Sequence, residues 1–298
     1  MSSSPPRSFS LAVFILWGFA GSLAYLPLFL VSLISTLALA AWRLFRQDNQ
    51  HILFININKI WGLPRRSSFA QRFAHQVMTS QFEVFFDTLR GIFRPHTLSI
   101  AGFEEFQQRL TAGEAYGRGQ ILVTAHLGSW ELAGKYSAQA GNKPFFALAK
   151  APPQRIFRQL MEKLRRHLEV RILWTDNHKR LTRTMVKLLH QGANLGFVMD
   201  QKPAGRQGPV VDFFGHPTPF VAGPAAMAHH RDCPIISVFC LRVGSGSFRL
   251  ISTTLVAAGE ARLLSLEEIT QRCASEIERV VRLYPEQWNW QYKRWVFL

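Results

Sequence analysis

The sequence predicts an α/β protein in which a mixed, substantially parallel sheet is flanked by helices. Apolar runs with the length of buried strands recur at 121–125, 145–149, 170–173, 195–199 and 234–241. Stretches with helical spacing lie between these runs, and such alternation is typical of a parallel sheet. The chain has 298 residues, which is enough to bury a sizeable core.

The first element is an apolar stretch, because residues 8–42 contain no charged side chain. Pro27 divides it into 8–26, which is long enough to cross a hydrocarbon core of about 30 Å, and 28–42, which favours an interfacial helix. We therefore expect a transmembrane or interfacial anchor over 1–46 and an α/β domain over 47–298. A cleaved signal peptide is the alternative, although its apolar region is usually only about 7–15 residues long.

The remaining helices are predicted from apolar spacing and capping residues. Residues 68–90 and 103–110 have helical periodicity, and so do 131–140, 154–168 and 179–191 between the strands. Ser265 and Glu268 form a capping box that opens a last helix, which ends at about residue 283 before Pro285.

The charge of the chain narrows the class of partner. The net charge of the chain is +16. A protein this basic is expected to bind a polyanion, either nucleic acid or an anionic membrane surface. The uncharged stretch 8–42 and the lack of a nucleic-acid-binding motif favour an anionic membrane surface as the partner. The Lys and Arg residues that follow the anchor place the large domain in the cytoplasm. Cys233, Cys240 and Cys273 lack metal-ligand spacing and are expected to be buried thiols.

The candidate chemistry lies in His126-Leu127-Gly128-Ser129-Trp130-Glu131, directly after the first predicted strand. Gly128 permits a sharp turn, and Ser129 can cap the next helix. We expect Glu131 to fold back and hold one nitrogen of the His126 imidazole, whose other nitrogen then takes a proton from a hydroxyl group. Parallel strands gather their carboxyl ends at one edge, so the polar residues after four strands are expected to meet there: His126, Lys150, Asp200 and Arg242.

Three blocks of sequence, at 121–134, 196–217 and 284–290, resemble the bacterial lipid A biosynthesis (late) acyltransferase family, which includes lauroyl and myristoyl transferases. That family is related to glycerolipid acyltransferases and, more distantly, to phosphatidylinositol mannoside acyltransferases. The resemblance implies a membrane-bound enzyme of the inner membrane whose catalytic domain lies on the cytoplasmic face. It also implies transfer of a fatty acyl chain from acyl carrier protein or coenzyme A to a hydroxyl of a lipid A precursor.

The resemblance also implies roles for single residues. His126 and Glu131 match the catalytic histidine and acid of the family, and Pro285-Glu286-Gln287-Trp288 matches a C-terminal signature expected to serve packing. The implied substrate-binding residues are Lys150, Arg165, Asp200, Gln201, Phe213, Phe214 and Gly215. Phe213 and Phe214 are expected to line an apolar groove for the acyl chain. No metal or resident cofactor is implied, since the acyl thioester is a co-substrate.

Other functions stay open at this point. The acceptor could be a lysophospholipid, a mannolipid or an ornithine-type lipid, and a catalytically inactive lipid-binding membrane protein would have the same fold. A serine hydrolase of the nucleophile-elbow type is disfavoured, because no Gly-x-Ser-x-Gly sequence occurs. A metal hydrolase is disfavoured by the lack of a paired-histidine helix motif.

Overall fold

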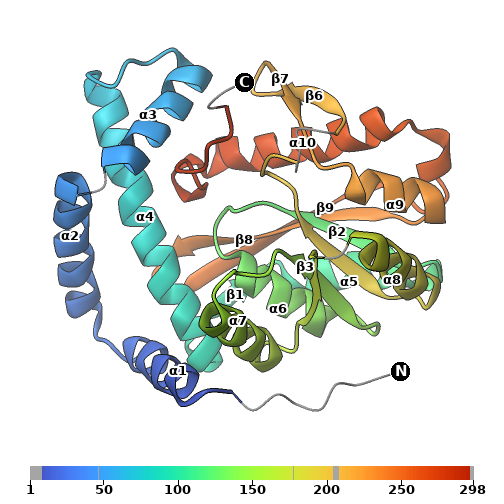
Figure 1. Ribbon diagram of the computed structural model, residues 1–298, viewed down its shortest axis with the longest axis horizontal. Coiled ribbons are helices and arrows are strands. Elements are labelled where there is room, and N and C mark those ends of the chain that lie inside the picture. Colours follow the sequence, from blue (N-terminus) through green and yellow to red (C-terminus); the bar gives the residue numbers. More distant parts are fainter. Residues whose placement is uncertain (1–8, 46, 177, 204–207, 296–298) are drawn as a thin grey trace.

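The computed structural model of the protein describes residues 9–45, 47–176, 178–203 and 208–295 (Figure 1). Its helices are α1 (Leu11–Leu23), α2 (Leu28–Phe45), α3 (Gln47–Trp61), α4 (Ser68–Phe93), α5 (Phe103–Ala115), α6 (Trp130–Ala140), α7 (Arg155–His167), α8 (His178–His190), α9 (Gly223–Arg231) and α10 (Leu266–Leu283), with the 3-10 turns η1 (Pro95–Thr97), η3 (Ala261–Leu263) and η4 (Pro285–Gln287). Its strands are β1 (Ser99–Ala101), β2 (Gln120–Thr124), β3 (Phe145–Ala149), β4 (Arg171–Trp174), β5 (Asn194–Val198), β6 (Val210–Phe213), β7 (His216–Pro219), β8 (Ile235–Gly244) and β9 (Ser247–Val256).

The central sheet has seven strands in the order β1-β9-β8-β2-β5-β3-β4. The five predicted strands are β2, β3, β4, β5 and β8, and every ladder between neighbours among them is parallel. The predicted mixed, mostly parallel sheet is therefore confirmed. The antiparallel partner β9 was not predicted, although it follows β8 across the tight Gly244–Ser247 hairpin.

Helices cover both faces of this sheet (Figure 1). In β2 the side chains alternate: Ile121 and Val123 pack with residues of α8, α9 and α10, whereas Leu122 packs with residues of α5 and α6 on the other face. The long helix α4 contributes to both cores, since Phe73 belongs to the first and Ile92 to the second. Together these contacts position α4 beside the region where β2 and β5 end.

The apolar N-terminal segment forms two helices, α1 and α2, on either side of Pro27. The helix α1 has 13 residues, about 20 Å of rise, and the chain turns at Ala24 before Pro27. Within the described ranges, no helix is both long and apolar enough to cross a membrane. The stretch 8–26, which was expected to be long enough to cross a membrane, thus contains the 13-residue helix α1, and a turn before Pro27 separates this helix from α2.

Helix α1 packs along α7 (Figure 1). The Lys163 ammonium of α7 lies 4.2 Å from the ring centroid of Phe14 and 5.4 Å from that of Trp17. The hydroxyl of Ser10 donates a hydrogen bond of 3.0 Å to the Gln159 side chain. Helix α2 lies along α4.

The chain after α10 returns to the end of β2. Leu127 and Trp288 form an isolated antiparallel bridge, and the Gly128 amide donates to the Gln287 carbonyl at 3.2 Å. Gly128 has a positive φ of 59°, and a Cβ there would lie 2.4 Å from the Cys240 carbonyl oxygen, so the turn requires glycine. Trp288 and Trp290 are almost fully buried, which agrees with the expected packing role of this signature.

Candidate functional site

His126 lies directly beyond β2, and its ring is held by Asp200 at the end of the neighbouring strand. The parallel ladder pairs Thr124 with Val198, so the residues two positions further along the two strands also come side by side. The His126 Nδ1 lies 2.8 Å from Asp200 Oδ1. The Asp200 Oδ2 accepts a second hydrogen bond from the His126 amide at 3.0 Å and a third from the Trp288 indole at 2.9 Å.

Glu131 does not hold the His126 ring, so the expected pairing is wrong. Glu131 lies in the first turn of α6, and its carboxylate accepts two hydrogen bonds from Arg165 of α7, at 3.2 and 3.4 Å. The Arg165 side chain is only 10% exposed, and a guanidinium at such a depth requires a carboxylate partner. This requirement turns Glu131 toward α7, while Asp200 takes the orienting position beside His126.

The protonation of the pair follows from its surroundings. Burial lowers the pKa of His126, but the charge of Asp200, its hydrogen bond and the charge of Glu131 together hold this pKa above its usual 6.5. Burial raises the pKa of Asp200, but the charge and hydrogen bonds of His126 and the Trp288 bond bring it below its usual value. An ionised Asp200 only accepts hydrogen bonds, so Nδ1 carries the proton and Nε2 is the basic nitrogen of a neutral His126. The Gln201 amide nitrogen lies 3.4 Å from Nε2.

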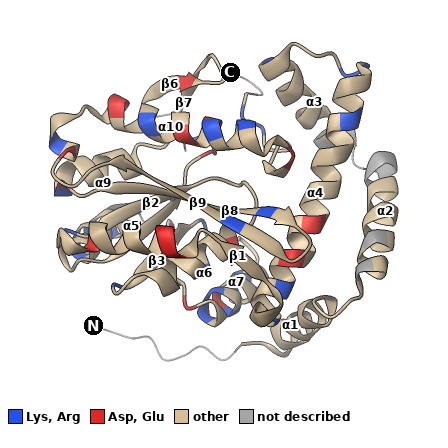
Figure 2. Cartoon of the chain, turned by 180° about the vertical axis from the view of Figure 1, so that it is seen from behind, with Lys and Arg blue, Asp and Glu red and all other residues tan. Residues whose placement is uncertain are grey.

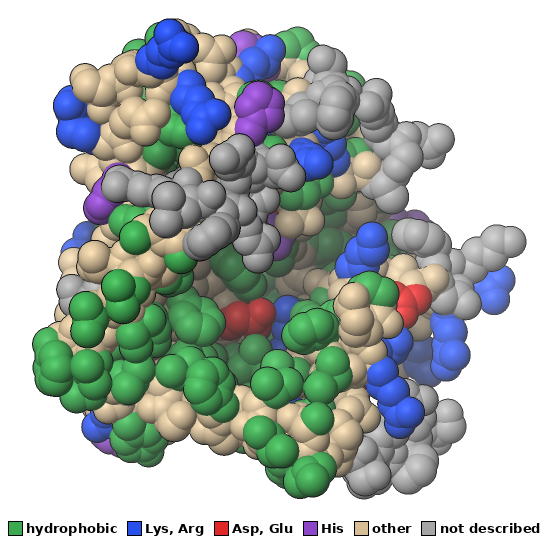
Figure 3. All heavy atoms as spheres, turned by 60° about the vertical axis from the view of Figure 1, so that its left-hand side comes forward, with side chains coloured by type: hydrophobic (Ala, Val, Ile, Leu, Met, Phe, Trp, Pro, Cys, Tyr) green, Lys and Arg blue, Asp and Glu red, His purple; other side chains and the backbone are tan. Residues whose placement is uncertain are grey.

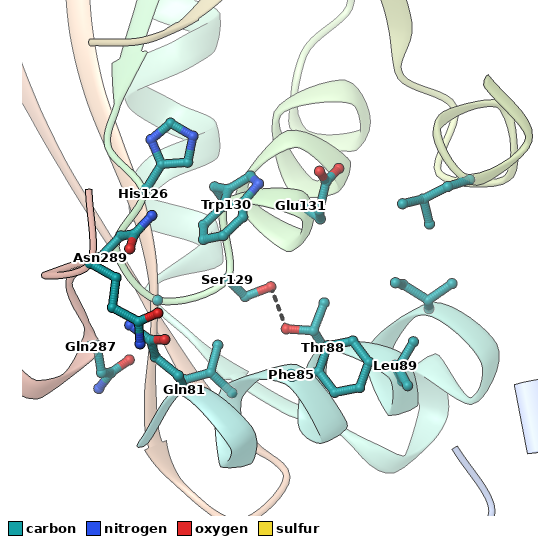
Figure 4. A pocket seen from close by; sticks show the side chains of 15 residues that line it. Gln81, Phe85, Thr88, Leu89, His126, Ser129, Trp130, Glu131, Gln287 and Asn289 are labelled. Atoms are coloured by element: carbon teal, nitrogen blue, oxygen red, sulfur yellow. Dashed lines mark hydrogen bonds between the residues drawn. The ribbon is translucent and has the colours of Figure 1, made fainter. Parts of the chain in front are cut away.

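A cavity of about 490 Å³ opens beside this pair. Figure 3 shows an acidic group at the bottom of a hollow that apolar side chains surround. The cavity residues come from α4, the 126–131 turn, α7 and the C-terminal segment: Gln81, Val84, Phe85, Thr88, Leu89, Ile92, His126, Gly128, Ser129, Trp130, Glu131, Leu164, Gln287, Asn289 and Gln291. Figure 4 shows Asn289 next to His126, Gln81 and Gln287 beyond Asn289, and the apolar side chains of Phe85 and Leu89 toward the other end of the cavity.

Ser129 lines this cavity without the arrangement of a nucleophile. Its hydroxyl accepts hydrogen bonds from the Leu132 amide at 3.3 Å, as the predicted cap of α6, and from the Thr88 hydroxyl at 2.8 Å. No hydrogen bond joins Ser129 to His126 among the described residues. A Ser–His couple of the hydrolase type is therefore not formed.

The structure separates several residues that were predicted to share one site. His126, Asp200 and Gln201 come together, whereas Arg165 binds Glu131. Arg165 borders a second, smaller cavity of about 40 Å³ on the inner side of Glu131. Lys150 is exposed after β3 and does not line the larger cavity, because β5 lies between β3 and β2. Arg242, at the end of β8, binds Asp87 of α4 at 2.7 Å and does not line the cavity beside His126.

Phe213 and Phe214 do not line the cavity, which corrects the expected acyl groove. Both are buried in an aromatic cluster that includes Phe220, Trp288 and Trp295, with the Phe214 and Trp288 ring centroids 5.9 Å apart. Gly215 forms the turn between β6 and β7 with a φ of 75°. These residues instead support Trp288, whose indole nitrogen binds Asp200.

Sequence reasoning missed the partners that come from distant parts of the chain. Trp288 was assigned only to packing, and Gln81, Phe85 and Asn289 were not assigned to the site. The sequence shows only that Phe85 shares the helical spacing of its apolar neighbours, whereas its exposed fraction of 51% is visible in the structure alone. Nothing in the sequence alone places the C-terminal segment against residues 126–128.

Comparison with known proteins shows to which family the chain belongs. A phosphatidylinositol mannoside acyltransferase of Mycolicibacterium smegmatis is 27% identical over 183 residues, which cover 60% of this chain and 58% of that protein. A phosphatidylinositol mannoside acyltransferase of Mycobacterium tuberculosis is 23% identical over 188 residues, which cover 63% and 58% of the two chains. The matches thus span less than two thirds of these relatives. The family model described as bacterial lipid A biosynthesis acyltransferase matches residues 4–296, nearly the whole sequence, and the chain belongs to that family.

Proposed function

We propose that the protein transfers a fatty acyl chain from a thioester, carried by acyl carrier protein or coenzyme A, to a hydroxyl group of a glycolipid. A lipid A precursor is the first candidate acceptor, and a mannolipid, as in the names of the relatives, is the alternative. One observation carries the proposal: the hydrogen-bonded His126–Asp200 pair lies at a cavity whose other part is apolar.

The pair provides general base catalysis. The Nε2 of neutral His126 takes the proton of the acceptor hydroxyl, which replaces the long Gln201 contact, as the hydroxyl oxygen attacks the thioester carbonyl carbon. The C–S bond then breaks, and the departing sulfur takes the proton back from the imidazolium. Asp200 stabilises the imidazolium and keeps the proton on Nδ1 in the resting state.

The apolar part of the cavity provides a site for the acyl chain. Phe85, Leu89 and Ile92 follow one face of α4 over about two turns, roughly 10 Å, and Leu164 of α7 lies with them. Burial of a methylene group contributes about 0.8 kcal/mol, so this surface favours a long alkyl chain over a short one.

The Glu131–Arg165 ion pair stabilises the packing of the two helices next to the site, α6 and α7. It ties the first turn of α6 to α7 through two hydrogen bonds, and the charge of Glu131 adds to the raised pKa of His126. We infer that Glu131 acts on the basicity of His126 through its charge and on the position of α7 through Arg165.

The exposed apolar surface of the N-terminal helices supports attachment to a membrane. Leu11, Ile15 and Phe19 are at least 62% exposed on α1, and Phe29 is 70% exposed on α2. Figure 2 shows no charged residue on α1. We propose that residues 1–46 attach the remaining domain, 47–298, to the cytoplasmic face of the inner membrane without α1 spanning it.

Purified protein tests the reaction directly. Acyl-coenzyme A and acyl carrier protein thioesters are each offered with one of three acceptors: a tetraacylated lipid A precursor, phosphatidylinositol mannoside and lysophosphatidylglycerol. The products are identified by mass spectrometry. We expect transfer to a glycolipid, and at least a 100-fold lower rate for His126→Ala, because general base catalysis typically contributes about 10²–10⁴-fold.

His229→Ala is the matched control, since His229 is exposed on α9 away from the cavity. Transfer by the wild-type protein to lysophosphatidylglycerol alone would contradict a glycolipid acceptor. A His126→Ala variant with wild-type activity would contradict the proposed base.

A further inference from the structure

The C-terminal segment presents alternate side chains to the cavity. Trp288 and Trp290 point into the core, where they are 2% and 0% exposed, whereas Gln287, Asn289 and Gln291 line the cavity. Alternation of this kind is the property of an extended chain. The residue types are notable because all three side chains on the cavity side are carboxamides.

Asn289 lies directly across from His126. The bridge between Leu127 and Trp288 is flanked by hydrogen bonds from Gly128 to Gln287 and from Asn289 to the His126 carbonyl, the second at 3.0 Å. Directly opposite residues of an antiparallel pair project from the same face, with Cβ atoms about 4.5–5.5 Å apart. Figure 4 shows the two side chains next to each other at one end of the cavity.

The carboxamide of Asn289 is available to a ligand. It forms no side-chain hydrogen bond with any residue in the part of the chain that the structure describes, and it can donate and accept at once. Gln287 differs, because its side chain binds both the amide and the carbonyl of Arg242, at 3.0 and 2.8 Å. Gln81 extends the polar wall from α4, where its nitrogen contacts the Trp288 carbonyl at 3.3 Å.

The charges around the cavity restrict what can occupy this end. None of the described residues that line it is Lys or Arg, and its acidic member is Glu131. A phosphate next to the reacting hydroxyl would thus lie near a carboxylate with no cation lining the cavity. A neutral group with several hydroxyls fits, because each hydroxyl can donate to the oxygen and accept from the nitrogen of a carboxamide.

We propose that Asn289 binds the acceptor through a hydroxyl adjacent to the one that is acylated, and that it thereby selects an uncharged sugar ring at His126. The inference rests on the proposed acyl transfer and deepens it. Asn289 contacts the non-reacting hydroxyl and fixes the ring so that the neighbouring hydroxyl faces Nε2. Gln81 and Gln291 contact more distant hydroxyls of the same ring.

The test compares two acceptors that share an alkyl chain, octyl β-D-glucopyranoside and 1-octanol, with one acyl thioester as donor. Wild-type protein is compared with Asn289→Leu, which removes the amide at similar volume, and with Asn289→Ser, which guards against misfolding. Asn142→Leu is the control, because Asn142 is exposed in the loop before β3. Hydrolysis of the thioester without acceptor is measured in every sample.

We expect the wild-type protein to prefer the glucoside. Both Asn289 variants should raise the KM for the glucoside about 5- to 10-fold, the range of one or two lost hydrogen bonds, and should raise it more than the KM for octanol. Equal use of the two acceptors by the wild-type protein, or an unchanged KM in both Asn289 variants, overturns the inference. A wild-type protein that neither hydrolyses the thioester nor transfers its acyl chain overturns the proposed function itself.

Discussion

Asp200 is a buried carboxylate whose surroundings fix what His126 can do. It is only 3% exposed, and a carboxylate at that depth is stable when hydrogen-bond donors surround it. Here the donors are the His126 ring, the His126 amide and the Trp288 indole. The bond from Nδ1 fixes the orientation of the imidazole, and the other two bonds hold the carboxylate of Asp200 in place.

The pH dependence of the reaction tests this arrangement. Neutral His126 is the reactive form, so kcat/KM should rise with pH and level off above the pKa of His126, which lies above 6.5. Asp200→Asn removes the charge that raises this pKa and leaves the burial that lowers it. We therefore expect the inflection to move to lower pH and kcat to fall. Asp176→Asn, at an exposed position, should leave the profile unchanged, and an unmoved inflection in Asp200→Asn would refute the pairing.

The choice between two acidic partners for His126 could not be made from the sequence. Glu131 is five residues away along the chain, and Asp200 is far away. Nearness in sequence favoured Glu131, yet the register of β2 and β5 brings Asp200 closer. Both residues were named as site residues, but the role of orienting His126 was assigned to the wrong one.

At the scale of elements, α4 connects the cavity to the sheet. One face carries Phe85, Leu89 and Ile92 toward the cavity. On another face of α4, Asp87 binds Arg242 at 2.7 Å and Arg90 at 2.8 Å. Asp87 also accepts a hydrogen bond from the Gly246 amide. These bonds join α4 to the β8–β9 hairpin, so the apolar wall keeps a fixed distance from the residues after β2.

The width of the apolar part of the cavity should determine which acyl chain length the protein prefers. Leu89→Phe adds volume to a wall residue that is 8% exposed, and we expect a preference for donors shorter by about two carbons or more. The kcat/KM for the longest donor should fall about 10-fold, as one methylene in a pocket contributes roughly 1–3 kcal/mol. A series of acyl thioesters measures the shift.

Leu283→Phe provides the same substitution at a position that is 57% exposed on α10 and outside the cavity. Its chain-length preference should match that of the wild-type protein. An unchanged preference in Leu89→Phe would show that the alkyl chain lies elsewhere.

At the scale of the whole molecule, an apolar surface and a basic charge occur together. Leu11, Ile15 and Phe19 form a stripe along α1, four residues apart, and Phe157 of α7 is a further exposed apolar residue, at 52%. The chain carries a net charge of +16. Apolar side chains that enter the interface and cations that attract anionic lipids stabilise the same attachment.

Vesicle binding tests this surface. The double substitution Ile15→Asp and Phe19→Asp should weaken binding to vesicles of phosphatidylglycerol and phosphatidylethanolamine about 10-fold or more, since each buried apolar side chain contributes roughly 1.5–3 kcal/mol. Binding of the wild-type protein should also weaken as salt is added. Cosedimentation measures both effects. Leu263→Asp, at an 82% exposed residue of η3, is the control, and equal binding of the two variants would contradict attachment through α1.

The sequence by itself determined the local features of this protein. Strand and helix types followed from the period of their apolar residues, the caps at Ser129 and Ser265 from their side chains, and the turn at residues 126–131 from Gly128. Tertiary structure decided the rest: the pairing of His126 with Asp200, the burial of Phe213 and Phe214 behind Trp288, the displacement of Lys150 and Arg242 from the site, and the position of Asn289. These depend on the order and register of strands and on the return of the C-terminal segment, which are set by contacts between residues far apart in the chain.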